Sequence, residues 1–335
     1  MLLTLDRCPG TLEPGHETYS PRCKVEMFGS RTKKISHILP FPPPNKDPEY
    51  SKVFQEARQR ISISGVQEKY SMALVKNHLE LVERKGQYIL KPIPGDLINR
   101  EYIPANEHIT MQVAKQVFGI ETAANAMIFF NDGTPAYLTR RFDYKVDGTK
   151  YQVEDFATLL GKTEEQEGAN YKYNGSYEDI GRIIKKYIPS ATIAMEKYFR
   201  LVVFNYLFSN GDAHLKNFSA IESPDGDYVL APAYDLMCTR LHIDDGDLGL
   251  QEGLYKGDMD SPSYGRFGIY TYDNFIEFAE RLAIPPKRSS KMIEQMLQKI
   301  PAVEPLVQRS FLSAELKVQY MSHLKEKEKR FNLKI

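Results

Sequence analysis

Asn210-Gly211-Asp212-Ala213-His214-Leu215-Lys216-Asn217 is the stretch around which the rest of the chain is organised. It follows an apolar run, residues 201–208, whose pattern predicts a helix buried in a core, and an Asn-Gly pair is typical of a helix end. A turn at residues 223–226 and a short predicted strand at residues 228–230 come next. The stretch is therefore predicted to be a loop between a buried helix and a β-hairpin.

Three oxygen-bearing side chains mark this part of the chain. Asp212 and Asn217 lie five residues apart in the loop, and Asp235 follows the predicted hairpin. Phosphoryl transfer uses such a set: one carboxylate positions the attacking hydroxyl or accepts its proton, while an amide oxygen and a second carboxylate hold Mg²⁺ against a triphosphate. An ordinary polar turn is the alternative, because Asn, Gly, Asp and His are all frequent in turns.

The composition describes a globular protein without a dominant charge. The 335 residues carry 44 Lys and Arg against 44 Asp and Glu, and 42% of them are hydrophobic. We therefore expect no direct binding to DNA or to a membrane surface. No apolar run reaches the length of a membrane span, and the first residues are not typical of a signal peptide. Three cysteines in so long a chain favour a reducing compartment, so a cytoplasmic location is expected.

The N-terminal region, residues 1–57, has no regular hydrophobic period. It contains Cys8, His16 and Cys23, whereas a zinc site needs four ligands and usually a closely spaced pair. A proline-rich connector follows, so this region is predicted to be a degraded Cys/His knuckle followed by an extended link.

The remaining chain is predicted to form two lobes. Residues 58–160 alternate like an antiparallel sheet, with one inserted helix from about residue 106 to residue 118. Residues 161–335 are predicted to be mostly helical. The fold class is therefore α+β, with a β-rich N-terminal lobe that binds nucleotide and a helical, catalytic C-terminal lobe.

Local sequence patterns predict where some of the C-terminal helices begin and which part of the last helix is exposed to solvent. Asp273 and Ser290 are predicted to be N-caps. A helix is predicted at residues 177–187. The alternating charges at residues 325–330 predict a solvated face of the last helix.

The loop resembles the Asp-x-His-x-x-Asn catalytic loop of the HipA-like Ser/Thr protein kinases, the toxin components of bacterial toxin–antitoxin systems, and Asp212, His214 and Asn217 fit that pattern. The resemblance covers about residues 58–320. It implies a two-lobed protein-kinase-like fold, with Asp212 as the catalytic residue and Asn217 and Asp235 as Mg²⁺ ligands. His214 is expected to brace the loop backbone, since kinase chemistry needs a carboxylate as the base.

The run Ser62-Ile63-Ser64-Gly65-Val66-Gln67-Glu68-Lys69 precedes the first strong strand. A small-residue turn lets backbone N–H groups approach phosphate oxygens, although an ordinary strand-entry turn has the same composition. The HipA-like kinases carry a Ser-x-x-Gly-x-Gln-x-Lys run here. The resemblance implies that the following residues bind ATP: Gly65, Val66, Gln67 and Lys69.

The same run carries two candidate autophosphorylation sites. In the family its first serine is autophosphorylated, which ejects the loop and inactivates the kinase. A phosphoserine adds about −1.5 to −2 charges, so the loop could not then stay beside ATP phosphates. Ser62 is the first candidate and Ser64 the second, because the Ser-Ile-Ser form is similar to the short HipT-like branch. For Ser64 the alternative is a hydroxyl that caps the turn.

Lys91 ends a predicted strand, and the family's Ile-x-Lys-Pro run implies that Lys91 binds ATP phosphates. An exposed lysine at a sheet edge is the alternative. Glu107 matches the second residue of the family's Asn-Glu pair, at the start of the next predicted helix. Either it orients Lys91 through a salt bridge or it only favours the helix N-terminus.

Glu154, Asp155 and Phe156 lie where the predicted strands give way to helices. The adenine-binding hinge of the family contains a Glu-Asp pair of this kind. The resemblance therefore implies that backbone groups of these three residues bind the base of ATP.

The resemblance implies an ATP- and Mg²⁺-dependent Ser/Thr protein kinase that acts as the toxin of a toxin–antitoxin system. Its implied substrate is a translation factor such as an aminoacyl-tRNA synthetase. The implied antitoxin is a helix-turn-helix DNA-binding partner or a small separate protein. The small protein would replace an N-terminal subdomain of the family, because the chain before Ser62 is too short to hold that subdomain.

Two other functions are compatible with part of the pattern. The aminoglycoside kinases, which are small-molecule phosphotransferases, share a similar Asp-x-x-x-x-Asn loop, but the doubled serine of the nucleotide loop favours a protein kinase. A non-catalytic pseudokinase that binds a partner is the other alternative. The retained Asp212, Asn217, Asp235 and Lys91 argue against a pseudokinase.

Overall fold

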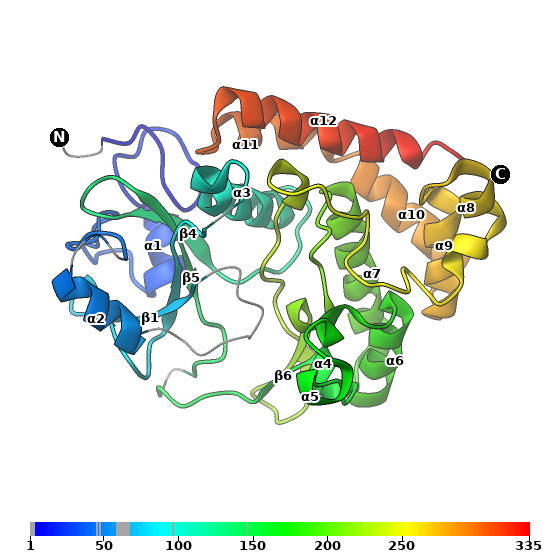
Figure 1. Cartoon of the computed structure of the whole chain (residues 1–335), viewed down its shortest axis with the longest axis horizontal. Helices are drawn as coiled ribbons and strands as arrows, with labels where there is room; N and C mark the ends of the chain where they lie inside the picture. Colours follow the sequence, from blue (N-terminus) through cyan, green and yellow to red (C-terminus); the bar gives the residue numbers. More distant parts are fainter. Residues whose placement is uncertain (1–3, 45, 47, 58–67, 96, 146) are drawn as a thin grey trace.

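The computed structural model describes residues 4–44, 46, 48–57, 68–95, 97–145 and 147–335. In this part of the chain the strands form two antiparallel sheets, and helices cover and follow them (Figure 1). The strands are β1 (Tyr70–Val75), β2 (His78–Leu81), β3 (Tyr88–Lys91), β4 (Asn125–Phe129), β5 (Pro135–Arg140), β6 (Val153–Asp155), β7 (Ser219–Glu222) and β8 (Tyr228–Leu230). The α-helices are α1 (Pro21–Phe28), α2 (Pro48–Ala57), α3 (Ile103–Gln116), α4 (Phe156–Leu159), α5 (Glu164–Glu167), α6 (Tyr177–Tyr187), α7 (Ala191–Leu207), α8 (Pro262–Phe267), α9 (Tyr272–Arg281), α10 (Pro286–Leu297), α11 (Val303–Gln308) and α12 (Ala314–Arg330).

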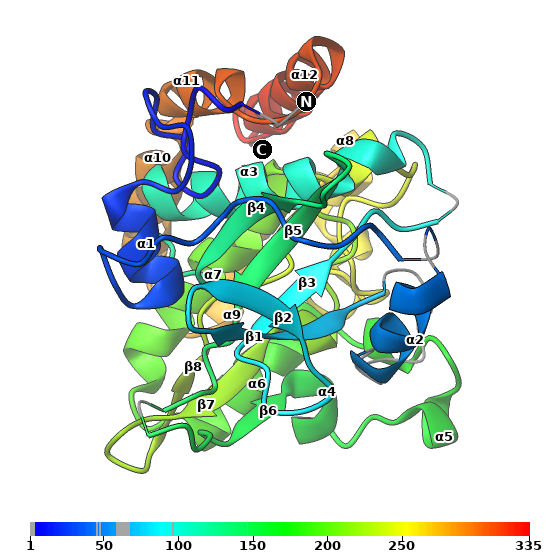
Figure 2. The same ribbon diagram turned by 90° about the vertical axis from the view of Figure 1, so that its left-hand side faces the viewer.

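The N-terminal lobe is built on a five-stranded sheet in the order β2-β1-β3-β5-β4. Successive side chains of a strand point to opposite faces, and both faces of this sheet are covered. On β4, Ala126 and Ile128 pack into a core shared with the N-terminal segment, whereas Met127 and Phe129 pack into the core that contains α3. Figure 2 shows α1 and α3 close to β4 and β5. Lys91, at the end of β3, is thereby held in the middle of the lobe.

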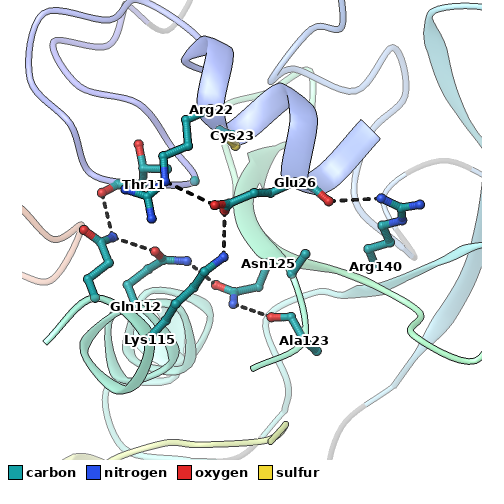
Figure 3. Close-up of polar contacts among 12 residues, drawn as sticks. Thr11, Arg22, Cys23, Glu26, Gln112, Lys115, Ala123, Asn125 and Arg140 are labelled. Atoms are coloured by element: carbon teal, nitrogen blue, oxygen red, sulfur yellow. Dashed lines mark hydrogen bonds and ion pairs between the residues drawn. The ribbon is translucent and has the colours of Figure 1, made fainter. Parts of the chain in front are cut away.

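The N-terminal segment is fastened to the sheet and to α3 by a polar network (Figure 3). Glu26 on α1 pairs with Lys115 of α3 at 2.7 Å, and its backbone carbonyl accepts a hydrogen bond from Arg140 of β5 at 3.1 Å. Gln112 Nε2 donates to Asn125 Oδ1 of β4 at 2.9 Å. The segment that showed no sequence period is therefore a bound cover of the sheet.

Cys8 and Cys23 are buried free thiols in this cover. The Cys8 sulfur lies 3.2 Å from the backbone nitrogen of Ser20 and 3.4 Å from those of Gly10 and Thr11, all three of which donate to it. In the described part of the chain no cluster of three His, Cys, Asp or Glu side chains has the arrangement of a metal site.

The C-terminal lobe is organised around α7. This helix is buried on nearly all sides, as the apolar run at residues 201–208 predicts, and it packs against α6, α10 and α12 (Figure 1). The predicted helix at residues 177–187 is confirmed as α6, with Ser176 as its N-cap in a reciprocal capping box. The second sheet, in the order β6-β7-β8, also belongs to this part of the fold. No helix in the described residues combines the length and the hydrophobicity needed to cross a membrane.

Two predicted N-caps are wrong. Thr271, not Asp273, precedes α9 and forms a capping box with Asn274, because the helix begins one residue after Thr271. Helix α10 begins at Pro286, so Ser290 lies inside it and donates its hydroxyl to the carbonyl of Pro286 at 2.7 Å. Proline is favoured at the first helical position, where its missing N–H has no partner to lose. That signal outweighs the capping preference of the serine. Helix α3 likewise begins at Ile103, three residues before the predicted start, with Pro104 in its first turn.

The charged run at the end of α12 is only partly solvated, which corrects the prediction for residues 325–330. Lys327 is fully buried and forms an ion pair with Asp247, and Arg330 pairs with the same carboxylate. The Lys327 ammonium also lies 4.4 Å from the centroid of the Tyr206 ring of α7. Alternating charges do not reveal which of them meets a carboxylate from a distant segment, so only the tertiary structure identifies the buried member.

Burial of His108 on α3 makes the stability of the fold depend on pH. Its side chain is fully buried, with Nε2 2.9 Å from the carbonyl oxygen of Gly10, and burial lowers the pKa of His108 to about 4. Since the unfolded chain has the ordinary pKa of about 6.5, it binds more protons than the folded chain between pH 6.5 and pH 4. Stability is therefore present above pH 6.5 and is lost as the pH falls toward 4.

We predict that lowering the pH from 7 to 5 reduces the free energy of unfolding of the wild type. In a His108→Gln variant, the same change of pH should reduce it by about 2 kcal/mol less. Gln keeps a donor for the Gly10 carbonyl but does not titrate. Urea unfolding at the two pH values measures the difference. The exposed His78, changed to Gln, is the control and should behave as the wild type. An equal pH dependence in His108→Gln and wild type would contradict the assignment.

Candidate active site

Four elements bring the predicted polar residues together. The loop after α7 carries Asp212 and ends in a 3₁₀ turn, Leu215–Asn217. Asp235 follows β8, and Lys91 ends β3. Residues 210–217 are thus a loop between a buried helix and the β7–β8 hairpin, as predicted. The site lies where the N-terminal sheet and α3 meet the loops of the C-terminal lobe.

Lys91 is the centre of an ion triad in which Lys91 and Glu107 are buried and the Asp235 side chain is 27% exposed. Its ammonium lies 2.6 Å from Glu107 Oε1 and also bonds to Asp235 Oδ1. The Lys91 side chain is 4% exposed, so the alternative of an exposed edge lysine is wrong. Glu107 does form the salt bridge to Lys91, which is one of its two predicted roles. Lys69 adds a second ammonium, 3.5 Å from Asp235 Oδ2.

The charges of the triad depend on one another. Burial alone would lower the pKa of Lys91, but the Asp235 and Glu107 carboxylates outweigh it and raise that pKa. Burial opposes the charge of Asp235 as well, and Lys69 and Lys91 nevertheless hold its pKa well below the ordinary value. Burial raises the pKa of Glu107 to about 7 against the effect of Lys91. The second oxygen of Glu107 is buried and has no hydrogen-bond partner in the described residues.

The backbone holds Asp235 in an unusual conformation. Its φ of 55° is left-handed, which is uncommon outside glycine and best tolerated by Asn and Asp. The segment after it is anchored to α3 by Asn106, whose Nδ2 donates to the Cys238 carbonyl at 2.8 Å and whose Oδ1 accepts from the Cys238 N–H at 3.1 Å. The carboxylate of Asp235 is therefore aimed at Lys91 by a fixed loop.

Asn217 and Asp235, the two residues predicted to bind Mg²⁺, are in contact through their side chains. Asn217 Nδ2 lies 3.4 Å from Asp235 Oδ2, and Asn217 Oδ1 accepts from the His214 N–H at 3.0 Å. An amide oxygen has two lone pairs, so Oδ1 retains one for a cation. Mg²⁺ is commonly held by one or two protein oxygens together with water and substrate phosphates. The donor set therefore fits Mg²⁺ in the company of a phosphate.

His214 was predicted to brace the loop, and the structure gives two contacts of this residue. Its backbone nitrogen bonds to Asn217, and its ring packs edge-on against Tyr173 with 5.2 Å between centroids. Burial lowers the pKa of His214 to about 4, so its imidazole is neutral near pH 7.

Asp212 contacts a residue that the sequence reading missed. The Tyr173 hydroxyl donates to Asp212 Oδ1 at 2.6 Å, from a 3₁₀ turn at Tyr171–Tyr173. Neighbouring Ala213 is held by Tyr177 of α6, which donates to its carbonyl at 2.7 Å. Tyr173 and Tyr177 lie in the segment 161–187, whose tyrosines carry no periodic or motif signal that points to their partners 39 and 36 residues later in the loop.

The proposed hinge is only partly open to a ligand. Strand β6 is an edge strand paired with β7, with Glu154 opposite Ala220. Asp155 caps α4 by accepting from the Thr158 N–H at 2.9 Å. Phe156 is fully buried and its N–H donates to the Phe218 carbonyl at 3.0 Å, so its own groups are occupied in the core. Hydrogen-bonding groups alternate along an edge strand, which leaves those of Asp155 pointing away from β7.

The remaining predicted residues lie outside the described part of the chain. These are Ser62, Ser64, Gly65, Val66 and Gln67. Lys69, the last residue of the predicted phosphate run, is described and lies at the site.

Gly249 packs against the loop and offers a test of how rigidly the loop is held. A Cβ at this position would lie 2.7 to 2.9 Å from backbone atoms of Ala213. Gly249→Ala is expected to lower the free energy of unfolding by about 1–3 kcal/mol through this overlap. Gly265→Ala on α8 is the matched control, because an added Cβ there meets nothing within 4 Å and should be neutral or mildly stabilising. Urea unfolding of both variants measures the difference, and equal effects would count against a tightly packed loop.

Curated relatives are described as kinases by their names. A Haemophilus influenzae protein named "Putative kinase" is 27% identical over 286 residues, which cover 79% of this chain and 80% of that protein. A Sinorhizobium fredii protein named "Putative kinase Y4dM" is 30% identical over 224 residues, or 60% of this chain and 51% of that protein.

Solved structures share the fold. The HipA toxin of Shewanella oneidensis, solved with HipB and operator DNA, superposes with a TM-score of 0.63 at 19% identity and covers 83% of this chain and 68% of its own. The Helicobacter pylori kinase CtkA superposes with a TM-score of 0.51 at 13% identity over 79% of this chain and 90% of its own. The family described as the HipA-like C-terminal domain matches residues 61–303. The chain therefore belongs to the HipA-like family and has its two-lobed, protein-kinase-like fold.

Proposed function

We propose that this chain is an ATP- and Mg²⁺-dependent protein kinase that transfers phosphate to Ser or Thr hydroxyls. The observation that carries the proposal is the ion triad of Lys91, Glu107 and Asp235. Burying one lysine between two carboxylates gains little stability by itself, because desolvation offsets the attraction between the charges. A lysine, a helix glutamate and a metal-binding aspartate in this arrangement are the parts that kinases use to hold ATP.

Asn217 and Asp235 would hold the Mg²⁺ ion, and Lys91 would hold the phosphates of ATP. When bound, the metal neutralises charge on the β- and γ-phosphates. The ammonium groups of Lys69 and Lys91 both lie against the Asp235 carboxylate. A phosphate group that enters with its bound Mg²⁺ would therefore lie beside these two positive charges. The adenine base would meet the open backbone edge at Asp155.

Asp212 would act on the substrate hydroxyl. One of its oxygens accepts from Tyr173, which fixes the carboxylate plane and leaves the other oxygen to accept the substrate proton. His214 is neutral near pH 7 and has its backbone engaged with Asn217, so it supports the loop and does not compete as base.

The biological role that we propose is that of a toxin in a bacterial toxin–antitoxin system. Its proposed substrate is a translation factor such as an aminoacyl-tRNA synthetase. The Shewanella HipA that shares this fold was solved with HipB and operator DNA, which supports an antitoxin partner that contacts DNA for this chain as well. A small separate protein is the other proposed regulator.

The direct test is phosphate transfer from labelled ATP by purified protein. We predict that Asp212→Asn lowers the rate of transfer by about 10²- to 10⁴-fold, because no side chain then accepts the hydroxyl proton. Asp225→Asn, an exposed residue of the β7–β8 turn, is the control and should retain wild-type activity. Equal rates in Asp212→Asn and wild type would remove the proposed mechanism. Label on aminoglycosides in place of protein would favour the small-molecule phosphotransferase.

Autophosphorylation is proposed at Ser62 and Ser64 and is tested by mass spectrometry after incubation with ATP. We predict phosphate on Ser62 first, its loss in Asp212→Asn, and a more persistent activity in the Ser62→Ala, Ser64→Ala double variant. The added negative charge would repel ATP phosphates, and the double variant cannot acquire it. Phosphate at neither serine in an active wild-type protein would rule out this mode of regulation.

A further inference from the structure

Lys172 is a buried lysine beside the active site that no motif in the sequence marks. It lies in the 3₁₀ turn Tyr171–Tyr173, and only 8% of the residue is exposed. Its ammonium lies 4.8 Å from the centroid of the Tyr173 ring. Lysine is rarely buried without a partner, because removing an ammonium from water costs several kcal/mol unless a counter-charge repays it.

No counter-charge is in contact with this ammonium. Within the described residues, no carboxylate lies within ion-pair distance of Lys172 and no hydrogen bond from its side chain is formed. Neighbouring lysines of the same region are different. Lys162 pairs with Glu167 at 3.0 Å, and Lys216 lies 3.5 Å from Asp155 and 3.3 Å from the Tyr171 hydroxyl. Lys172 is thus the uncommitted cation of this segment.

The charges that act on Lys172 are those of the active site. Burial lowers the pKa of Lys172, and Lys69 and Lys216 lower it further, while Asp212 and Asp235 raise it. The geometry agrees, because the ammonium lies 4.8 Å from the centroid of the Tyr173 ring and the hydroxyl of that ring bonds to Asp212 at 2.6 Å. Lys172 therefore lies on the side of the site that contains Asp212.

The turn that carries Lys172 is held on both sides. Tyr173, which follows it, donates to Asp212 Oδ1 at 2.6 Å, and Tyr171, which precedes it, accepts from Lys216 of the catalytic loop at 3.3 Å. The carbonyl of Tyr173 also accepts from the Gln251 N–H at 2.9 Å. These bonds fix the backbone of Lys172 relative to Asp212, so its side chain is preorganised rather than free to move away.

The other cations of the site are already engaged. Lys91 bonds to Glu107 and Asp235, and Lys69 lies against Asp235. Lys216, the lysine of the loop itself, lies 3.5 Å from Asp155 and 3.3 Å from the Tyr171 hydroxyl, so it is engaged as well.

We propose that Lys172, on the Tyr171–Tyr173 turn, binds the terminal phosphate of ATP. Its ammonium stays in contact with that phosphate while the phosphate is transferred to the substrate hydroxyl. This inference rests on the proposed function and extends it to a residue from outside the motif loops. In the transfer, the bond from the substrate oxygen to the γ-phosphorus forms, the bond from that phosphorus to the ADP oxygen breaks, and the hydroxyl proton passes to Asp212. Lys172 stays protonated and donates to oxygens of the moving phosphoryl group throughout.

The first test is nucleotide binding, which does not require turnover. Calorimetry compares ADP·Mg²⁺ with AMP-PNP·Mg²⁺, a non-hydrolysable triphosphate, on the full chain. Lys172→Met is expected to weaken AMP-PNP binding by about tenfold or more and to change ADP binding less than about twofold, because only the triphosphate carries the group that the ammonium contacts. An equal loss for both nucleotides, or no loss for either, would overturn the proposal.

Lys186→Met is the matched control. Lys186 also precedes a tyrosine and its ammonium also lies 4.8 Å from that ring, but it is exposed at the end of α6. It should bind both nucleotides as the wild type does. Lys172→Arg keeps a cation and should recover part of the preference for the triphosphate, whereas a purely structural role would give no such recovery.

Stability and turnover separate the remaining outcomes. Since an unpaired buried ammonium is removed, Lys172→Met should unfold at the same or a higher urea concentration than the wild type, and marked destabilisation would mean that the lysine serves the fold. In an active wild-type protein, kcat should fall by about 10²-fold. If the wild type transfers no phosphate but shows the predicted loss of AMP-PNP binding in Lys172→Met, the kinase proposal fails and the terminal-phosphate contact stands.

Discussion

The ion triad of Lys91, Glu107 and Asp235 is the contact on which the arrangement of this protein depends. It joins the last residue of β3, a residue of α3 and the loop after β8, which belong to different parts of the fold. An unpaired buried charge costs several kcal/mol, so the burial of Lys91 and Glu107 depends on their pairing with each other and with Asp235. The sheet, the helix and the C-terminal loop are therefore positioned together by one set of charges.

The surroundings of the triad hold it by uncharged contacts. Asn106 exchanges two hydrogen bonds with Cys238, so α3 carries both Glu107 and the anchor of the Asp235 loop. Helix α12 extends along both lobes (Figure 1), and its buried Lys327 pairs with Asp247. Gly249, two residues later, packs against Ala213 of the loop at residues 210–217. The N-terminal segment closes the far face of the sheet through Glu26 and Lys115. Much of the chain outside the motifs thus serves to restrict movement of a small set of side chains.

The sequence predicted those parts of the site that depend on local spacing. Asp212, His214 and Asn217 belong to one short loop, and Lys91 follows three apolar strand residues, so local spacing placed these side chains while the family resemblance supplied their roles. Helix ends were less predictable, as the wrong caps at Asp273 and Ser290 show, because several residues near a helix end can cap it and the packing of the helix decides between them. Phe156 shows a related limit of prediction from sequence. It was predicted to bind the base of ATP, but its side chain is buried in the core and its N–H donates to Phe218.

Sequence alone determined the α+β class, the main strands and helices of the two lobes, and the chemical types gathered in the motif loops, because hydrophobic period and turn composition act over a few residues. Helices α1 and α2 of the N-terminal segment carried no such signal. Only the tertiary structure decided that Glu107 reaches Lys91, that Tyr173 bonds to Asp212 and that the buried Lys172 has no carboxylate within ion-pair distance among the described residues. Those relations join segments that lie 16 residues apart in the first case and 39 in the second. A local sequence pattern does not show which distant side chains will be buried next to one another. Their proximity in a medium of low dielectric constant determines their charge states and therefore their chemistry.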